Sequence, residues 1–148
     1  MLKSAVYPNP DADKEHHSFV FSIYPHKGGW KEAGTPKRAY LLNNPLAARV
    51  KESDEGSLPG EFSLVKTDAD NVIIEVVKEE RKGNDMIIRF YETANERTSG
   101  EMIFGREILG IWECSMLEEE EQEIPFTDAA ASYNIKPYEI KTWKIKLK

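Results

Sequence analysis

This sequence has one thiol, Cys114, so no disulfide can form within the chain. Cys114 falls inside an apolar strand pattern, which favours a buried structural thiol over a nucleophile and fits a reducing compartment. No run of 18 or more apolar residues is present, so no membrane-spanning helix is predicted. The first residues lack a charged region followed by an apolar core, which predicts a cytoplasmic location unless a targeting signal precedes Met1.

Basic residues are too few and too scattered for a nucleic-acid-binding surface. The chain has 20 Lys and Arg against 26 Asp and Glu, a net charge of −6, whereas affinity for phosphate backbones depends on clustered cations. A glycine-rich phosphate loop, a nucleophile elbow and a CxxC motif are all missing, so dehydrogenase, kinase and hydrolase-triad functions have no support. The 148 residues, 40% apolar and 31% charged, fit one globular domain.

Strand signals recur at intervals of about ten residues. Residues 18–24 alternate with period two and are rich in aromatic and β-branched side chains, which predicts a strand. Further strands are predicted at residues 46–50, 62–66, 72–79, 86–93, 98–104, 109–116, 129–135 and 138–147. This pattern indicates an all-β antiparallel sandwich. Residues 28–43 are the exception, a short helix or irregular segment interrupted by Gly34 and Pro36.

The most distinct local prediction is a β-hairpin formed by residues 72–79 and 86–93. Lys82, Gly83 and Asn84 lie between the two strands. Gly83 and Asn84 both tolerate positive φ, so a tight turn is expected there.

The closing strand changes the parity of its apolar residues. Tyr138 and Ile140 share one face, whereas Trp143 and Ile145 share the other, so a β-bulge is predicted near Thr142. Lysines interleave with these residues at Lys141, Lys144, Lys146 and Lys148. They predict a cationic sheet edge that discourages aggregation.

Histidines and carboxylates give no argued catalytic or metal site. His16 and His17 are adjacent and His26 follows a proline, so the three do not form a converging ligand set. Residues 118–121 with Glu123 form an acidic run, which predicts a solvated loop.

Two further carboxylates are predicted to lie on strands. Glu92 and Glu139 are expected to form structural ion pairs with Arg89 or Lys141. No catalytic residue and no metal ligand is therefore assigned.

Exposed aromatic rings are the remaining candidates, because a flat ring stacks on the apolar face of a sugar. Trp112 and Trp143 sit in apolar strand patterns and are predicted to be core residues. Trp30, between Gly29 and Lys31, is the best surface candidate. We predict that it contacts a sugar or a neighbouring domain.

Several motifs occur in a fixed order along the chain. They read LKSAVYPNPDAD, FVFSIYPH, YLLNNPL, DNVIIEVVKEE, MIIRFYE, WECSMLEE and IKPYEIKTWKIKL. In this order and spacing they resemble the C-terminal β-sandwich region of family 38 glycoside hydrolases, the α-mannosidases. The sequence departs from the family pattern at Lys3, where arginine is usual, and in the extra acidic residues 118–121.

The resemblance implies a single C-terminal domain, residues 1–148, from a longer α-mannosidase chain. Residues 1–4 would then begin within a strand. In the family, a retaining mechanism, a catalytic Asp and a divalent metal, usually zinc, belong to an N-terminal domain. No catalytic or metal residue is carried over to this chain, and no cofactor is expected in it.

The function implied by the resemblance is a structural accessory domain with the catalytic domain of the same polypeptide as its partner. Two alternatives remain open: an independent carbohydrate-binding module and a protein-interaction β-sandwich. No nucleic-acid or membrane partner is expected. Self-association to a homo-oligomer is also predicted, because an excised sandwich exposes sheet edges and apolar surface.

Overall fold

The computed structural model describes residues 5–50 and 56–148. Within these ranges there are one helix and eight strands. They are α1 (Thr35–Asn43), β1 (Val65–Thr67), β2 (Val72–Glu79), β3 (Met86–Glu92), β4 (Thr98–Phe104), β5 (Ile108–Cys114), β6 (Glu120–Glu123), β7 (Ala130–Ile135) and β8 (Ile140–Leu147).

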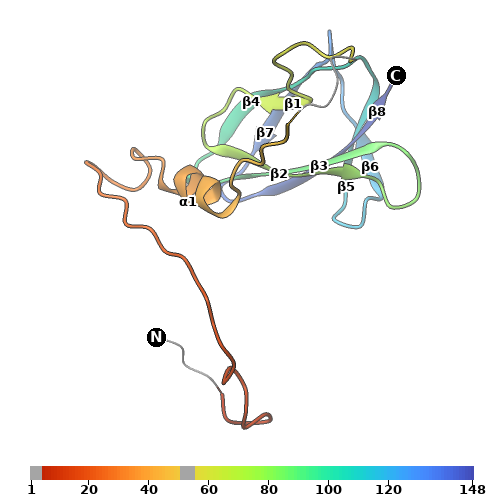
Figure 1. Ribbon diagram of the computed structural model, residues 1–148. Coiled ribbons are helices and arrows are strands. Elements are labelled where there is room, and N and C mark those ends of the chain that lie inside the picture. The colour runs from red at the N-terminus through yellow and green to blue at the C-terminus, as the bar shows by residue number, and fades with distance from the viewer. Residues whose placement is uncertain (1–4, 51–55) are drawn as a thin grey trace.

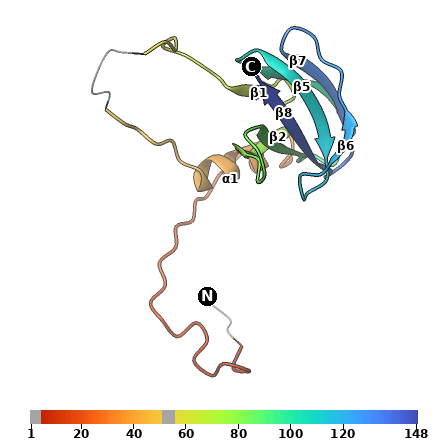
Figure 2. The ribbon, with the colours of Figure 1, turned by 90° about the vertical axis from the view of Figure 1, so that its right-hand side faces the viewer.

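The strands form two antiparallel sheets, in the orders β1-β4-β7 and β2-β3-β8-β5-β6. Figures 1 and 2 show the two sheets facing each other, with α1 beside the end of the sandwich where β2 begins. The predicted all-β antiparallel sandwich with one short helix is therefore confirmed.

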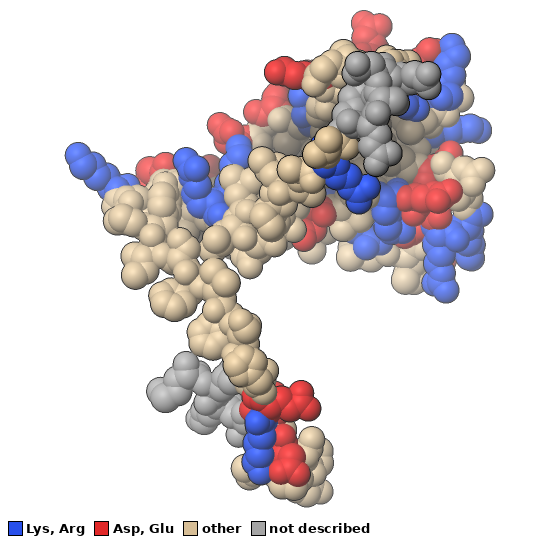
Figure 3. Space-filling model, in the orientation of Figure 1, with Lys and Arg blue, Asp and Glu red and all other residues tan. Residues whose placement is uncertain are grey.

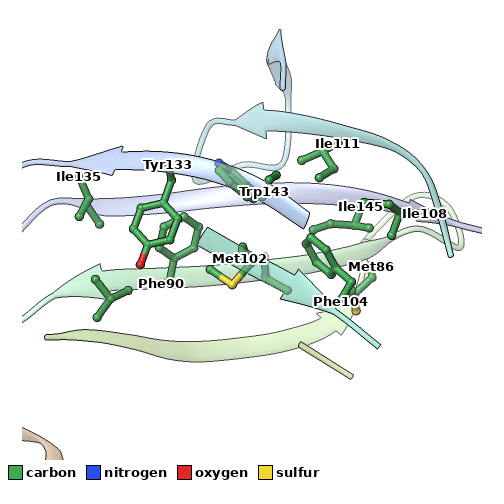
Figure 4. Close-up of a cluster of buried hydrophobic side chains, with 13 residues drawn as sticks. Met86, Phe90, Met102, Phe104, Ile108, Ile111, Tyr133, Ile135, Trp143 and Ile145 are labelled. Atoms are coloured by element: carbon green, nitrogen blue, oxygen red, sulfur yellow. The ribbon is translucent and has the colours of Figure 1, made fainter. Parts of the chain in front are cut away.

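The core fills the space between the sheets, and its centre is aromatic (Figure 4). The ring of Phe90 lies 5.2 Å from that of Trp143, almost perpendicular to it, and 5.2 Å from that of Tyr133. Such tilted aromatic pairs each contribute about 0.5–1.5 kcal/mol beyond the burial of their area. Trp143 is 1% exposed, which confirms its predicted core position.

The β-hairpin of β2 and β3 is confirmed, but the predicted geometry of its turn is wrong. The pairing runs from Val72 opposite Glu92 to Glu79 opposite Met86. Six residues connect the strands, closed by a 2.8 Å hydrogen bond from the Glu80 amide to the Asp85 carbonyl. Neither Gly83 nor Asn84 has positive φ. A loop of this length reverses the chain without the left-handed residues that a two-residue turn demands.

Residues 18–24 and 46–50 do not form the predicted strands. Their local pattern suits a strand, but a strand exists only where its backbone pairs with a neighbour. No described segment pairs with either stretch. Figure 1 shows the trace of residues 18–24 leading away from the sandwich. The strand predicted at residues 1–4 lies outside the described residues.

Helix α1 begins between Gly34 and Pro36, the two residues that were predicted to interrupt a helix. Gly34 precedes it in the left-handed conformation, with φ of 62°, and Pro36 occupies the first turn. Proline is tolerated there because the first amides of a helix have no intrahelical acceptor. Residues 28–43 therefore contain a turn followed by a helix, and no residue of α1 is fully buried.

Strand β8 is regular and central, which contradicts both the predicted bulge and the predicted edge. Its register with β3 is continuous from Tyr91 opposite Ile140 to Met86 opposite Ile145. Thr142 is 2% exposed because the outer face is covered there too, and its hydroxyl lies 3.7 Å from the Met116 sulfur. The second face is covered only in part, because Thr142 is buried whereas Tyr138 and Ile140 are each 57% exposed.

Candidate functional site

A groove of about 530 Å³ lies where the start of α1 meets the loops at one end of the sandwich. Three chain segments form its walls: the turn and first residues of α1, the residues before β2, and the residues after β3. It is lined by Trp30, Lys31, Glu32, Ala33, Gly34, Pro36, Lys37, Arg38, Leu41, Asp70, Asn71, Thr93 and Ala94.

Two ion pairs connect the walls of this groove. The Lys31 ammonium lies 3.2 Å from the Glu96 carboxylate, and that of Lys37 lies 3.3 Å from Asp70. All four side chains are well exposed, so each pair contributes at most about 1 kcal/mol. The pairs connect the segment around α1 to the loops before β2 and after β3.

The floor of the groove rests on a buried carboxylate, Glu92, which is 1% exposed. One oxygen accepts hydrogen bonds from the Ala94 amide at 2.5 Å and the Asn71 side chain at 2.9 Å. The other accepts from the amides of Asn95 at 2.9 Å and Tyr138 at 3.0 Å. This carboxylate therefore joins the residues before β2, after β3 and before β8.

Burial by itself raises the pKa of Glu92, but the hydrogen bonds from Tyr138, Ala94 and Asn71 outweigh it and hold the pKa below its ordinary value. Glu92 is ionised at neutral pH. It serves as an anchor for backbone amides.

Two residues bonded to Glu92 have left-handed backbones, which are uncommon outside glycine. The φ angles are 60° for Asn95 and 55° for Tyr138. The backbone amides of Asn95 and Tyr138 both donate to the same Glu92 oxygen, and these hydrogen bonds hold the two loops in place. Tyr138 itself is 57% exposed.

Trp30, the sugar or interdomain contact predicted from the sequence, lies in the wall of this groove. It is 43% exposed, and the Lys31 ammonium lies 5.7 Å from its ring centroid. The groove thus presents an accessible indole beside polar groups of Asn71 and Thr93. Whether Trp30 binds a ligand stays a prediction.

The predicted ion pairs of Glu92 and Glu139 are wrong. Glu92 bonds to amide donors, and Glu139 accepts a hydrogen bond from the Lys136 amide at 2.7 Å. The sequence did contain a signal for Glu92: it shares its parity with Met86, Ile88 and Phe90 on β3, all of which are buried. Parity places the carboxylate at the inner face, where it needs several donors.

The acidic run is also more ordered than predicted. Glu118 is anchored by the Lys78 ammonium at 2.5 Å and the Arg81 amide at 2.8 Å. The Lys78 hydrogen bond is the main cause of a lowered pKa at Glu118. Residues 120–123 form β6, paired with β5. Lys144 supports this arrangement because its ammonium bridges Glu80 and Glu120.

The remaining candidates take structural positions. Cys114 is buried, as predicted, and burial raises the pKa of its thiol, which disfavours the reactive thiolate. Trp112 is half-buried on the outer face of the five-stranded sheet, with the Lys144 ammonium 6.0 Å from its ring, and is not a core residue.

The histidines lie in exposed N-terminal segments: His16, His17 and His26. Among residues 5–50 and 56–148, no three His, Cys, Asp or Glu side chains converge as a metal site would require. In the same ranges no helix is long and apolar enough to cross a membrane.

Fold and site together define a β-sandwich domain whose buried polar groups hold its loops in place. Residues 71–143 match the family model described as the glycosyl hydrolases family 38 C-terminal beta sandwich domain. Residues 71–143 therefore belong to this family, and the chain is homologous to α-mannosidases.

Two relatives show the extent of the similarity. The chain is 29% identical over 150 residues to alpha-mannosidase G of Dictyostelium discoideum, which covers 97% of this chain and 14% of that protein. Its alignment with human alpha-mannosidase 2C1 is 30% identical over 95 residues and covers 62% of this chain and 9% of that protein. The chain thus spans a small part of the relatives that it matches.

Proposed function

We propose that this chain is the C-terminal accessory domain of an α-mannosidase, where it has a structural role and packs against the catalytic part of the same polypeptide. The observation that carries the proposal is the extent of the match. Alpha-mannosidase G aligns with 97% of this chain using 14% of its own length. Both proportions are expected if this chain corresponds to one domain of such an enzyme.

The groove supports a structural role, because three carboxylates at or beside it are already engaged. Asp70 and Glu96 are paired with lysines, and Glu92 accepts four hydrogen bonds. A retaining glycosidase needs two carboxyl groups about 5 Å apart on either side of the scissile bond. The geometry of Glu92, enclosed by amides, suits loop anchoring.

An activity assay tests this role directly. The purified chain is expected to hydrolyse no aryl α-mannoside above a buffer blank, with or without added zinc. Turnover that survives stringent purification and is lost on substitution of a residue in this chain would contradict the proposal.

Carbohydrate binding is a second candidate function, favoured by the exposed indole of Trp30 in a groove with polar walls. Such a ring stacks on the apolar face of a pyranose, while amide and hydroxyl groups bond to its hydroxyls. Titration calorimetry with mannose oligosaccharides tests this function. Trp30→Ala is expected to weaken binding at least tenfold, whereas the exposed control Leu117→Ala leaves it unchanged. Absence of binding by the unsubstituted chain rejects this second candidate.

A further inference from the structure

Residues 18–24 have the sequence of a strand and no partner among the described residues. Their large apolar side chains are strongly exposed: Phe19 68%, Val20 87%, Phe21 76% and Ile23 84%. No backbone hydrogen bond joins this segment to another described residue. An extended segment of this kind offers unpaired amide and carbonyl groups along both sides.

Both faces of this segment are apolar. Phe19, Phe21 and Ile23 share one parity, and Val20 and Tyr24 share the other with a serine between them. The segment contains no charge, proline or glycine. Figure 3 shows it as an uncharged stretch between the sandwich and a charged cluster further toward the N-terminus. Apolar residues on both parities are typical of strands that are covered on both faces of a sheet.

The edges of this domain's own sheets are poor acceptors for such a strand from a second copy. Strand β6 is acidic, β1 has only three residues, and β2 is interrupted by a bulge between Ile74 and Val76. At β7 the first residue, Ala130, already exchanges both backbone hydrogen bonds with Thr127, which leaves only residues 131–135 of this edge for an added strand. Each of these features discourages strand addition.

We propose that residues 18–24 dock as a strand in a β-sheet supplied by the remainder of an α-mannosidase polypeptide. The inference rests on the proposed function, because it names the contact by which the domain joins the rest of the enzyme. The acceptor is a sheet edge with apolar surroundings on both faces. Affinity comes from main-chain hydrogen bonds, and alternate side chains give the register.

The test uses the intact chain and, as probe, alpha-mannosidase G from which the 150 matched residues have been deleted. Three variants are compared with the unsubstituted chain by interferometry. Phe21→Pro removes a strand amide, Val20→Asp places a charge on the opposite face, and Leu117→Asp charges another exposed site, 78% exposed, outside the segment. All three residues are exposed, so unchanged thermal midpoints will show that the sandwich is intact.

We expect Phe21→Pro and Val20→Asp to weaken the complex at least tenfold and Leu117→Asp to change it less than twofold. Hydrogen exchange of residues 19–24 should slow at least a hundredfold in the complex. Equal binding by all variants overturns strand docking and leaves the accessory role standing. Equal loss in all three also overturns it, as the contact would then be unspecific. Failure of the unsubstituted chain to bind overturns both proposals.

Discussion

Substituting Glu92 by glutamine tests whether one buried carboxylate holds the loops at this end of the sandwich. The change keeps size and shape but replaces one oxygen with an NH₂ group. Each oxygen of Glu92 accepts two hydrogen bonds. In either orientation of the amide, two donors therefore face another donor and lose their acceptor.

The expected cost follows from this count. A hydrogen bond to a charged group contributes about 1.5–3 kcal/mol, and a buried donor without a partner costs about 1–3 kcal/mol. Losing two acceptor sites in a pocket where Glu92 is 1% exposed should destabilise the domain by roughly 2–4 kcal/mol. For a domain of this size, each kcal/mol lowers the thermal midpoint by about 2–4 °C.

The effect should depend on pH in a defined direction. The pKa of Glu92 is lowered in the folded state, so its stabilisation is fully present above the ordinary pKa of about 4.3 and is lost as pH falls through the folded value. The difference between the unsubstituted chain and Glu92→Gln should therefore shrink below about pH 4.

Urea denaturation at pH 7 and at pH 3.5 measures both effects. Glu123→Gln, at an exposed position on β6, is the matched control and should change stability by about 0.5 kcal/mol or less. Equal midpoints for the two variants at pH 7 would refute the anchoring role of Glu92.

Two further substitutions probe the five-stranded sheet and the loop that connects β2 to β3. Gly83→Ala should cost about 1 kcal/mol or less in unfolding free energy, because the backbone is not left-handed but a Cβ there forces the Glu80 carboxylate, which pairs with Lys144, to shift. A loss above about 2 kcal/mol in urea would show that the turn needs glycine. Lys144→Met should destabilise the domain by about 1 kcal/mol, since Glu80 and Glu120 lose their shared cation. That loss should diminish at 1 M salt, and an effect independent of salt would point to packing instead.

The sequence predicted the strands that pair within residues 62–147 far better than the segments before them. The pattern of residues 18–24 resembles that of β3, yet only β3 has neighbours, on both sides. Pairing is a tertiary property, so periodicity reports only suitability for a sheet. Strand β6 was missed for the opposite reason. Its four residues have low strand propensity, but pairing with β5 and the ion pair between Lys144 and Glu120 hold them in the sheet.

The groove was predictable only in part. Trp30 stood out because it lies between a glycine and a lysine, but its neighbours Asn71 and Thr93 come from a distant part of the chain. A 2.9 Å hydrogen bond from the Thr93 amide to the Asn71 carbonyl holds these two residues together. No local pattern encodes such a contact. The parity of Glu92 would have indicated its burial, but the four donors that make this burial tolerable come from three loops.

Deleting residues 5–23 provides a final test of how the N-terminal segment relates to the sandwich. None of these residues is buried, and no hydrogen bond or ion pair connects them to the strands described. The unfolding free energy should therefore change by about 0.5 kcal/mol or less, measured by urea denaturation. The same deletion should reduce any concentration-dependent association, because it removes the apolar side chains of Phe19, Phe21 and Ile23 from the surface. Sedimentation of both forms up to high micromolar concentration measures this difference. A large loss of stability would show instead that residues 18–24 pack on the sandwich and have a partner within the chain.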